Sequence, residues 1–587
     1  MNNQMVMDLF NWWLMTLGNL MGPCPDGGGP LGAALWQIQF KIASIVTFIA
    51  MGIGVLYILL WLFAFLIECI FSKITYRLAN RRETRSPTRL ELKQFKEENH
   101  YHPYDLFEQL RKFYKPQGSE EYTFIGLDAQ KSNKPVAIKD TDRMKHTQVI
   151  GMTGTGKTTG VFLPMFSQDA AKKRPVIFID PKGEWDTVNT VDAIAHYERR
   201  PQDLYCFLLS NPEYSCSYNP LYAPECDPDV IIDAFLSNFI SDNTYYRDVS
   251  ITLFRHAYKI LHSLKKPFTV MDIYAYLNNE KCFDEHNLLC KGNPMASKHM
   301  LLMDGEIRKL NAQHKNWRVC LIGLNNYLMM FDHPLLNDAD GDIDLYDCIK
   351  HKKMVYFQLP TNAYPVLAPV IGRMVQANLR YLSSLIQTKH LVTESPISLI
   401  IDEYGTFADE TFLEVLNKAR SSGMMVTLGH QSMSDLTAVS ESFMHRIDEN
   451  TLNKIILKQT DPKLCEHISR SIGTFKKQGR TYREAKGFFG NKILTGEASL
   501  KYENEFILHP DKIKNLHPYG QAYFISRADN QLRCVNISSI GGLRTSQGFK
   551  KNCKENKRDG LGFYLRYYLL SGVGATETNN DGWYLDR

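Results

Sequence analysis

One long apolar run near the start of the chain stands apart from everything that follows. Residues 42–67 contain no charged side chain, and Lys41 and Glu68 bound the run. As a helix that rises about 1.5 Å per residue, it would span about 39 Å, which is enough to cross a bilayer with tilt. A helix of this length that is apolar on every side would be unusual inside a soluble domain. The pattern therefore predicts a transmembrane helix at residues 42–67.

The basic residues around this run predict its orientation. Residues 1–40 contain no lysine or arginine, whereas a basic stretch follows the run, with Lys73, Arg77, Arg81, Arg82 and Arg85. Basic residues gather on the cytoplasmic side of a membrane helix, so we expect the bulk of the chain in the cytoplasm. A cleaved signal peptide would begin earlier and carry a basic first segment.

A second apolar stretch, at residues 5–21, leaves two interpretations open. It is short and carries Asp8. It can cross the membrane and form a hairpin with the later helix, and the glycine- and proline-rich residues 22–30 would then be the outer turn. It can equally lie at the membrane surface, anchored by Trp12 and Trp13. We favour the hairpin.

Beyond residue 119 the pattern switches between short strands and helices. Residues 119–225 alternate short apolar runs, such as 176–180, with helical stretches. From residue 226 to about 345, amphipathic helical periodicity replaces the strand-like runs. Strands return at residues 354–359 and 397–401. The pattern predicts an α/β domain with a mostly parallel sheet, interrupted by an all-α insertion.

Composition changes this picture little. A net charge of +5 over 587 residues fits an ordinary solvated surface at least as well as a nucleic-acid surface. The 12 cysteines are scattered and form no Cys-x-x-Cys pair. This spacing argues against a disulfide framework and against a zinc site, and it fits the reduced thiols of a cytosol.

The strongest chemical signal is a complete P-loop. Residues 151–158 read Gly-Met-Thr-Gly-Thr-Gly-Lys-Thr, between a strand-like segment and a segment that can open a helix. Its glycines let the backbone amides turn inward and form an anion site with the helix N-terminus. We therefore predict binding of ATP with Mg²⁺, in which Lys157 reaches the β- and γ-phosphates and the Thr158 hydroxyl binds the metal. The expected nucleotide-binding residues are Gly151, Thr153, Gly154, Thr155, Gly156, Lys157, Thr158 and Thr159.

An apolar strand that ends in two carboxylates has the form of a Walker B motif. Residues 398–403 read Ser-Leu-Ile-Ile-Asp-Glu. The end of a parallel strand would place Asp402 beside the P-loop, where it can bind the Mg²⁺ shell. Glu403 could then polarise the attacking water as a general base.

Two further polar residues are candidates with an open alternative. Gln431 ends the next strand, at residues 424–431, and can hydrogen-bond the water or the γ-phosphate and report its loss. A glutamine at a strand end can also be purely structural. Arg420 lies near the end of the helix predicted at residues 412–420. It can project toward a neighbouring subunit as an arginine finger, or it can be a solvated partner of the helix dipole.

With these motifs, the chain resembles the type IV secretion coupling proteins, the TraG/TraD-like group of P-loop ATPases. No single later motif is diagnostic, but the order and spacing of the motifs are specific. They run through most of the cytosolic part, as HTQVIGMTGTGKTT, IFIDPKGEW at 177–185, SYNPL at 217–221, VYFQLP at 355–360, LIIDEYGTF at 399–407 and KARSSGMMVTLGHQS at 418–432.

This resemblance implies a RecA-like nucleotide domain, an all-α domain facing the cytoplasm, and a hexameric ring anchored in the inner membrane. It implies ATP-driven delivery of DNA, protein or both into a type IV secretion (conjugation) channel, with channel components and relaxosome DNA or protein effectors as partners. It also implies that Arg420 is a finger acting on a neighbouring subunit and that Gln431 is a sensor. Asp180, Lys182 and Glu184 match another stretch of the family, and their role stays open beside simple capping of the following helix.

Together, pattern and motifs divide the chain into six segments. They are a membrane anchor at 1–72, a juxtamembrane linker at 73–118, the first part of the nucleotide-binding domain at 119–225, the all-α domain at 226–345, the second part of the nucleotide-binding domain at 346–545 and a C-terminal tail at 546–587.

Three functional classes stay open. The first is a motor that moves a polymer, which the carboxylate pair at residues 402 and 403 favours because a pure receptor needs no general base. The second is a docking receptor whose nucleotide mainly controls assembly. The third is a membrane-anchored DNA translocase of the chromosome-segregation type. The basic stretch at residues 476–480 either lines a DNA channel or is an exposed basic loop.

Overall fold

The computed structural model contains two units, Met1–His100 and Tyr101–Arg587, which are considered separately. The structure describes residues 8, 11–13, 15, 16, 19, 30–83, 122–130, 134–223, 225–290, 292–388, 395–419, 421–486, 492–517, 519–527, 531–537, 539–545 and 548–569.

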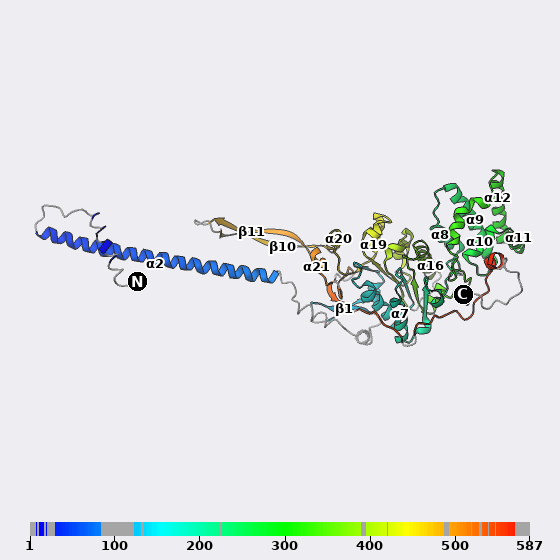
Figure 1. Ribbon diagram of the computed structural model, residues 1–587, viewed down its shortest axis with the longest axis horizontal. Coiled ribbons are helices and arrows are strands. Elements are labelled where there is room, and N and C mark those ends of the chain that lie inside the picture. Colours follow the sequence, from blue (N-terminus) through cyan, green and yellow to red (C-terminus); the bar gives the residue numbers. More distant parts are fainter. Residues whose placement is uncertain are drawn as a thin grey trace. The chain divides into compact units, whose positions relative to one another are not determined.

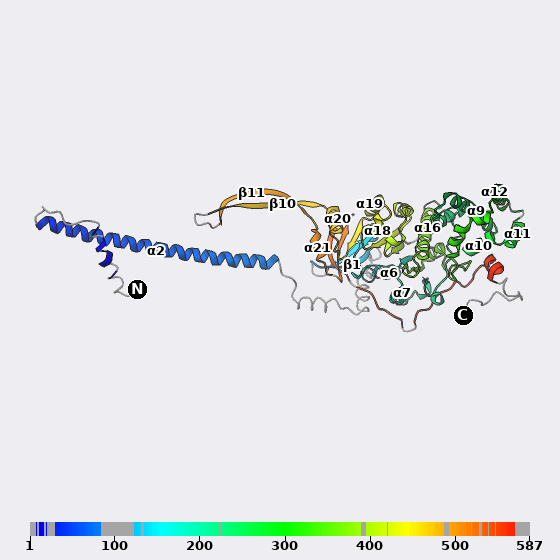
Figure 2. The same cartoon turned by 45° about the horizontal axis from the view of Figure 1, so that its top comes forward.

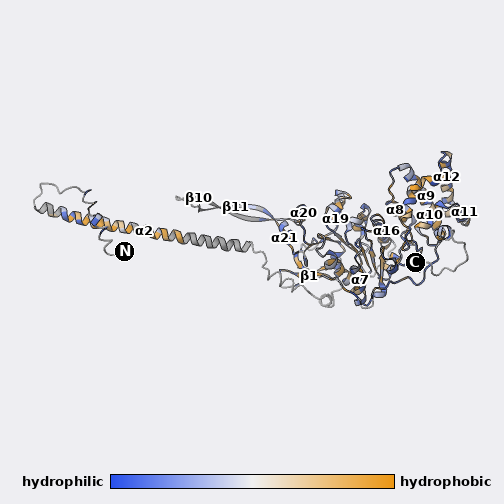
Figure 3. Ribbon diagram, viewed as in Figure 1, coloured by the Kyte–Doolittle hydropathy of each residue, from blue (hydrophilic) through white to orange (hydrophobic). Residues whose placement is uncertain are grey.

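The first unit is dominated by one helix, α2 (Pro30–Glu83), which extends beyond the predicted span at both ends. Its Trp36–Phe63 stretch is long and apolar enough to cross a membrane. Most of the described apolar side chains of that stretch are exposed. Figure 3 shows that apolar residues run along much of this helix. Trp13 donates its indole N–H to Thr47 Oγ1 of α2 at 3.3 Å, so the described part of the earlier apolar stretch contacts this helix. Whether residues 5–21 cross the membrane stays a prediction.

The second unit is built on an eleven-stranded sheet (Figure 1). Its strand order is β2-β1-β13-β12-β9-β3-β8-β7-β4-β6-β5. All neighbours from β9 to β5 pair in parallel, and the strands beyond β9 pair antiparallel. The mostly parallel sheet is thus confirmed. Its strands are β1 (Tyr122–Asp128), β2 (Pro135–Lys139), β3 (Thr147–Ile150), β4 (Val176–Asp180), β5 (Leu204–Leu208), β6 (Met354–Gln358), β7 (Ile397–Ile401), β8 (Met424–His430), β9 (Asn453–Ile456), β12 (Gln521–Ser526) and β13 (Gln531–Asn536).

Every residue of the central strands β4, β7 and β8 is buried. Parallel strands that are covered on both faces need such mostly apolar sequences. Alternate side chains of β4 enter different cores. Phe178 joins the core with helices α6 (Leu163–Ala171) and α7 (Trp185–Tyr197), whereas Ile177 and Ile179 join the core with α16 (Leu367–Thr388) and α17 (Leu413–Ala419). The sheet is therefore the middle layer of three.

A group of helices lies between β5 and β6 in sequence and gathers at one end of the sheet (Figures 1 and 2). Most of them begin at a side-chain cap, for example Asn243 on α9 and a capping box of Thr269 and Asp272 on α10. Their core is continuous with the α16 face of the sheet. The helices are α8 (Pro228–Leu236), α9 (Thr244–His262), α10 (Val270–Asn278), α11 (Glu280–Leu289), α12 (Pro294–Ala312), α13 (Trp317–Cys320), α14 (Ile322–Met329) and α15 (Leu345–Lys350).

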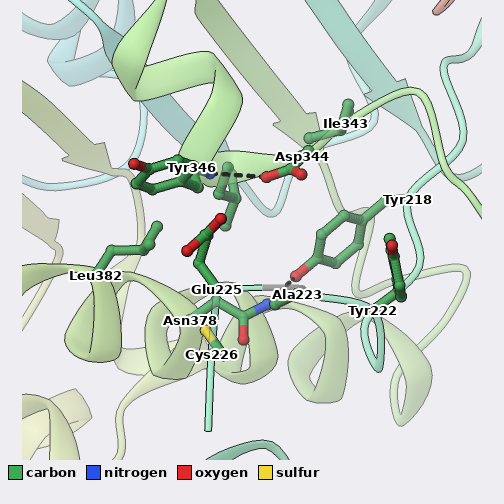
Figure 4. A pocket seen from close by; sticks show the side chains of 11 residues that line it. Tyr218, Tyr222, Ala223, Glu225, Cys226, Ile343, Asp344, Tyr346, Asn378 and Leu382 are labelled. Atoms are coloured by element: carbon green, nitrogen blue, oxygen red, sulfur yellow. Dashed lines mark hydrogen bonds between the residues drawn. The ribbon is translucent and has the colours of Figure 1, made fainter. Parts of the chain in front are cut away.

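A small pocket marks the place where this helical group joins the sheet unit (Figure 4). Tyr218 lines it and accepts a hydrogen bond from Asn378 of α16 at 2.8 Å. Asp344 lines it too and caps α15 through the Tyr346 amide at 3.0 Å. The cavity measures about 10 Å³, which is room for about one water, so the junction is closely packed.

The basic stretch at 476–480 is not a loop. It belongs to β10 (Thr474–Lys486), which pairs antiparallel with β11 (Lys492–Phe506) in a separate two-stranded sheet. The expectation of a loop was wrong because the long polar ladder continues through the glycine at position 479. The remaining α-helices are α5 (Asp140–Arg143), α18 (Ser434–Thr437), α19 (Glu441–Asn450), α20 (Pro462–Ile472) and α21 (Pro510–Lys514).

The chain after the sheet forms a strap, residues 548–569, that runs from the β5 edge onto the helical group. Asn552 donates to the carbonyls of Pro201 and Leu204 beside β5, at 2.7 and 2.6 Å. Lys554 and Lys557 then pair with an acidic loop before α15, at 2.7 Å from Asp340 and 2.9 Å from Asp342. Farther along, Phe563 is buried with its ring against His286 of α11. The strap therefore joins the two parts of this unit.

Replacing Lys557 with glutamate tests this attachment. The new carboxylate would face Asp338 and the nearly buried Asp342, so like-charge repulsion should detach the strap. We expect amide hydrogen exchange of residues 548–569 to rise about tenfold, or about 1.4 kcal/mol of local opening, while the sheet keeps its protection. Lys550→Glu, at an exposed position of the strap, is the matched control. Equal exchange in both variants would contradict the attachment.

Candidate nucleotide-binding site

The P-loop leaves β3 and runs directly into a helix. Gly154 and Gly156 have φ values of 77° and 87°, which side chains disfavour. A Cβ at Gly151 would lie 2.7 Å from Thr155 Oγ1. The helix begins with the wide turn η2 (Thr158–Phe162) and continues as α6. The loop is therefore a tight backbone curl at a helix N-terminus, the geometry that binds phosphate.

Lys157 is folded back onto this loop. Its ammonium donates to the Gly151 carbonyl at 2.7 Å and lies 3.3 Å from Glu403 Oε1. Burial lowers the pKa of Lys157, and the charges of Glu403 and Asp402 oppose that shift. The lysine thus stays close to the carboxylates at the end of β7.

The two predicted metal ligands contact each other. Thr158 Oγ1 donates to Asp402 Oδ2 at 2.6 Å. The other oxygen, Asp402 Oδ1, accepts from the Glu403 amide at 2.8 Å. A hydroxyl and a carboxylate side by side are oxygen ligands of the kind that Mg²⁺ takes alongside phosphate oxygens and water. The donor set therefore fits the predicted metal.

Glu403 and Gln431 connect the remaining predicted residues in one chain of contacts. Glu403 has left-handed backbone torsions, with φ 43° and ψ 50°, directly after β7. Gln431 donates through Nε2 to Glu403 Oε1 at 3.0 Å and accepts from Thr153 Oγ1 at 2.7 Å. The P-loop, the end of β8 and the end of β7 therefore meet through Thr153, Gln431, Glu403 and Lys157.

The other expected residues have separate positions. Thr155 donates to the Met152 carbonyl at 2.7 Å and so closes the P-loop on itself. The carbonyl of Thr159 accepts from the Ile540 amide at 2.7 Å, which ties the P-loop helix to the chain after β13. Arg420 lies outside the described residues, so its proposed finger role stays a prediction.

Lys182 is part of this site, although the sequence left its role open. It follows β4, and its ammonium lies 2.9 Å from Asp402 Oδ2 and 3.0 Å from Thr158 Oγ1. Asp180, at the end of β4, accepts from the Lys182 amide at 3.0 Å and from the Tyr356 hydroxyl at 2.9 Å. Burial, reinforced by the nearby charge of Asp402, raises the pKa of Asp180 to about 7.

Capping of α7 does not explain the stretch with Asp180, Lys182 and Glu184. Glu184 occupies the N-cap position of α7, but its side chain makes no capping hydrogen bond. The sequence position of Lys182 indicates its place in the site. A lysine two residues after a parallel strand lies at the same sheet edge as the Walker B carboxylates.

A buried polar network lies behind Gln431. His430 and Gln148 of β3 are joined through their Nε2 atoms at 2.7 Å, and His430 Nδ1 lies 3.0 Å from the Ser432 carbonyl. The amide of Gln148 donates to a neutral imidazole, which in turn donates to the carbonyl. Burial lowers the pKa of His430 to about 4. On the far side, Gln148 accepts from Lys454 at 2.6 Å.

Comparison with known proteins adds two findings. Residues 396–518 match the family model described as the TraM recognition site of TraD and TraG. This range includes Asp402, Glu403 and Gln431. The chain is thus similar to TraD and TraG over this range. No curated protein sequence matches it.

The fold of the chain is similar to that of the bacterial conjugative coupling protein TrwB. Against an unbound monoclinic form of TrwB, the TM-score is 0.51 at 17% identity, covering 76% of this chain and 93% of the other. Against a trigonal form in complex with sulphate, the TM-score is 0.51 at 17% identity, covering 76% and 95%. The RecA-like fold expected from the sequence is thus confirmed.

The depressed pKa of His430 predicts an acid-sensitive fold for this protein. The unfolded chain gains the proton near pH 6.5, but the folded chain gains it only near pH 4, so stability should fall as the pH drops between these values. In this pH range, each such group lowers the free energy of unfolding by about 1.4 kcal/mol for each pH unit of acidification.

The free energy of unfolding is measured by urea denaturation from pH 7 to pH 4. We expect it to depend less on pH in His430→Gln, which keeps an amide opposite Gln148, because the contribution of His430 is lost. His146 has its pKa lowered to about 4 by burial as well, so part of the slope should remain. His445→Gln, at an exposed position of α19, is the control. An unchanged slope in His430→Gln would contradict the neutral buried imidazole.

Proposed function

We propose that this chain is an ATP-driven coupling protein that delivers DNA or protein substrates to a type IV secretion channel. The observation that carries the proposal is the convergence of Thr158 with Asp402, and of Lys157 with Glu403 and Gln431, at one edge of a parallel sheet. Ligands bind at this edge in open α/β sheets. The match to the TraM recognition site and the TrwB-like fold support the substrate-delivery part.

Each residue then has a defined task in ATP hydrolysis. The P-loop amides at residues 151–159 cradle the phosphates, and Lys157 pairs with the β- and γ-phosphates. Thr158 and Asp402 would hold Mg²⁺, which would neutralise charge on the phosphate oxygens. Glu403 would orient and deprotonate the attacking water, and Gln431 would contact the water or γ-phosphate and sense its release.

The contact between Lys157 and Glu403 gives this mechanism a switch. While Lys157 lies 3.3 Å from Glu403, its ammonium is paired with the carboxylate. The phosphates of ATP would attract Lys157 toward themselves. Glu403 would then keep its bond from Gln431 and be free to accept a proton from water. Binding of substrate would thus prepare the base.

Assembly and location complete the proposal. The basic residues after the apolar run at residues 42–67 support an inner-membrane anchor with the bulk of the chain in the cytoplasm. We propose a homo-hexameric ring in which Arg420 completes the ATP site of a neighbouring subunit. The ring would receive relaxosome DNA or protein effectors and pass them to the channel components.

Two variants should separate binding from hydrolysis. We expect Lys157→Ala to lose nucleotide binding, because the phosphates lose their cation. Glu403→Gln should bind ATP but hydrolyse it at least about 100-fold more slowly, because the amide cannot act as a base. Fluorescent-nucleotide binding and phosphate release measure the two steps. Lys418→Ala, an exposed lysine paired with Glu414 on α17, is the control. Wild-type hydrolysis by Glu403→Gln would overturn the assignment.

Mixed subunits should test the ring. Arg420→Ala subunits keep their P-loop, and Lys157→Ala subunits keep Arg420. Each variant alone should be nearly inactive, because an arginine finger contributes on the order of 10³-fold in turnover. Co-assembled mixtures should recover some hydrolysis at mixed interfaces. A confirmed mixed assembly no more active than its components would show that Arg420 does not act between subunits.

A further inference from the structure

Lys182 occupies the space between the side chains assigned to the metal. Its ammonium is 2.9 Å from Asp402 Oδ2 and 3.0 Å from Thr158 Oγ1, and it is 3.8 Å from Glu403 Oε1. Thr158 Oγ1 and Asp402 Oδ2 are 2.6 Å apart. Neighbouring ligands of an octahedral Mg²⁺ at about 2.1 Å lie about 3 Å apart. The lysine therefore contacts the same two oxygens that a bound Mg²⁺ would share.

The surroundings explain why a cation is held there. Asp402 is fully buried, and a buried carboxylate without a partner is strongly destabilising. The Lys182 amide is fixed by Asp180, whereas its side chain is 30% exposed and can reach solvent. The backbone is thus anchored while the ammonium can leave. A lysine ammonium and Mg²⁺ cannot occupy one position, because they repel each other and compete for the same lone pairs.

We propose that Lys182 is a resident cation that neutralises Asp402 in the empty site and must leave before Mg²⁺ binds. The proposal rests on the nucleotide site described under the proposed function. It follows that Lys182 stabilises the metal-free protein and weakens metal binding by the same coupling. A released ammonium would lie beside the phosphates, so metal binding would also deliver a second positive charge to them.

The direct test uses Mn²⁺ as a stand-in for Mg²⁺, because free Mn²⁺ is measured by electron paramagnetic resonance. The detergent-solubilised full chain is titrated with Mn²⁺ at saturating ADP. We expect Lys182→Met, which keeps the length of the side chain without its charge, to bind Mn²⁺ about tenfold more tightly than the wild type. Lys182→Arg, which keeps the charge, should show no gain. Lys418→Met, at the exposed end of α17, is the control for loss of a lysine.

Thermal unfolding provides a second readout that does not depend on activity. Without metal, Lys182→Met should melt at a lower temperature than the wild type, and Mn²⁺ with ADP should raise its Tm by more than it raises that of the wild type. Lys182→Gln serves in the same test if the methionine variant does not fold. Mn²⁺ affinity that is unchanged or weaker in both uncharged variants would overturn the proposal.

The two proposals fail differently. If fluorescent ADP binds the wild type and Lys157→Ala equally, the nucleotide site itself is wrong. If ADP binding depends on Lys157 and Mn²⁺ binding depends on Asp402, as tested with Asp402→Asn, but neither uncharged Lys182 variant gains Mn²⁺ affinity, only the resident-cation proposal is wrong.

Discussion

The parallel pairing of β3, β8, β7 and β4 is the constraint on which the candidate site depends. Ile150 of β3 aligns with His430 of β8, and Ile401 of β7 aligns with both Leu428 of β8 and Ile179 of β4. Parallel strands in this register end at one edge of the sheet. The P-loop, Gln431, Asp402 and Lys182 therefore lie close together, although they are far apart in the sequence. At Gly429 a Cβ would lie 2.4 Å from Phe162 and 3.2 Å from Asp402 Oδ1, so β8 can pass this close only with a glycine.

A buried ionic network holds the helix behind the P-loop against that sheet. Arg143 pairs with Asp169 of α6 at 2.7 Å, both side chains being fully buried, and donates to Ser398 of β7 at 3.1 Å. Although burial favours the protonated acid, Arg143 and Arg174 hold the pKa of Asp169 at about 2. Breaking such a pair typically costs about 3–5 kcal/mol. The network fixes α6, and with it the direction of the helix N-terminus that follows the P-loop.

Much of this arrangement could be predicted from the sequence, because it depends on local signals. The central strands are short, mostly apolar runs, and the carboxylates at 402 and 403 and the glutamine at 431 follow them directly. The sheet edge on which Lys182 lies could be predicted from its place after a strand, but its contact with Asp402 could not. That contact requires β4 to lie beside β7, and 220 residues separate the two side chains. Residues 476–480 of β10 were taken for a loop, because their sequence is polar throughout and shows no alternation of apolar and polar residues. The strap was not assigned, because its ion pairs depend on an acidic loop more than 200 residues earlier in sequence.

The same contacts that build the site also continue into the helical group. Phe407 follows Glu403 and lies against Gly372 of α16, where a Cβ would come within 2.4 Å of the ring, and its carbonyl accepts from Gln376 at 3.2 Å. On the other side of α16, Arg373 donates to Asn238, which follows α8, at 2.9 Å. Helix α16 therefore contacts both the segment after Glu403 and the segment after α8, and so joins the end of β7 to the helical group.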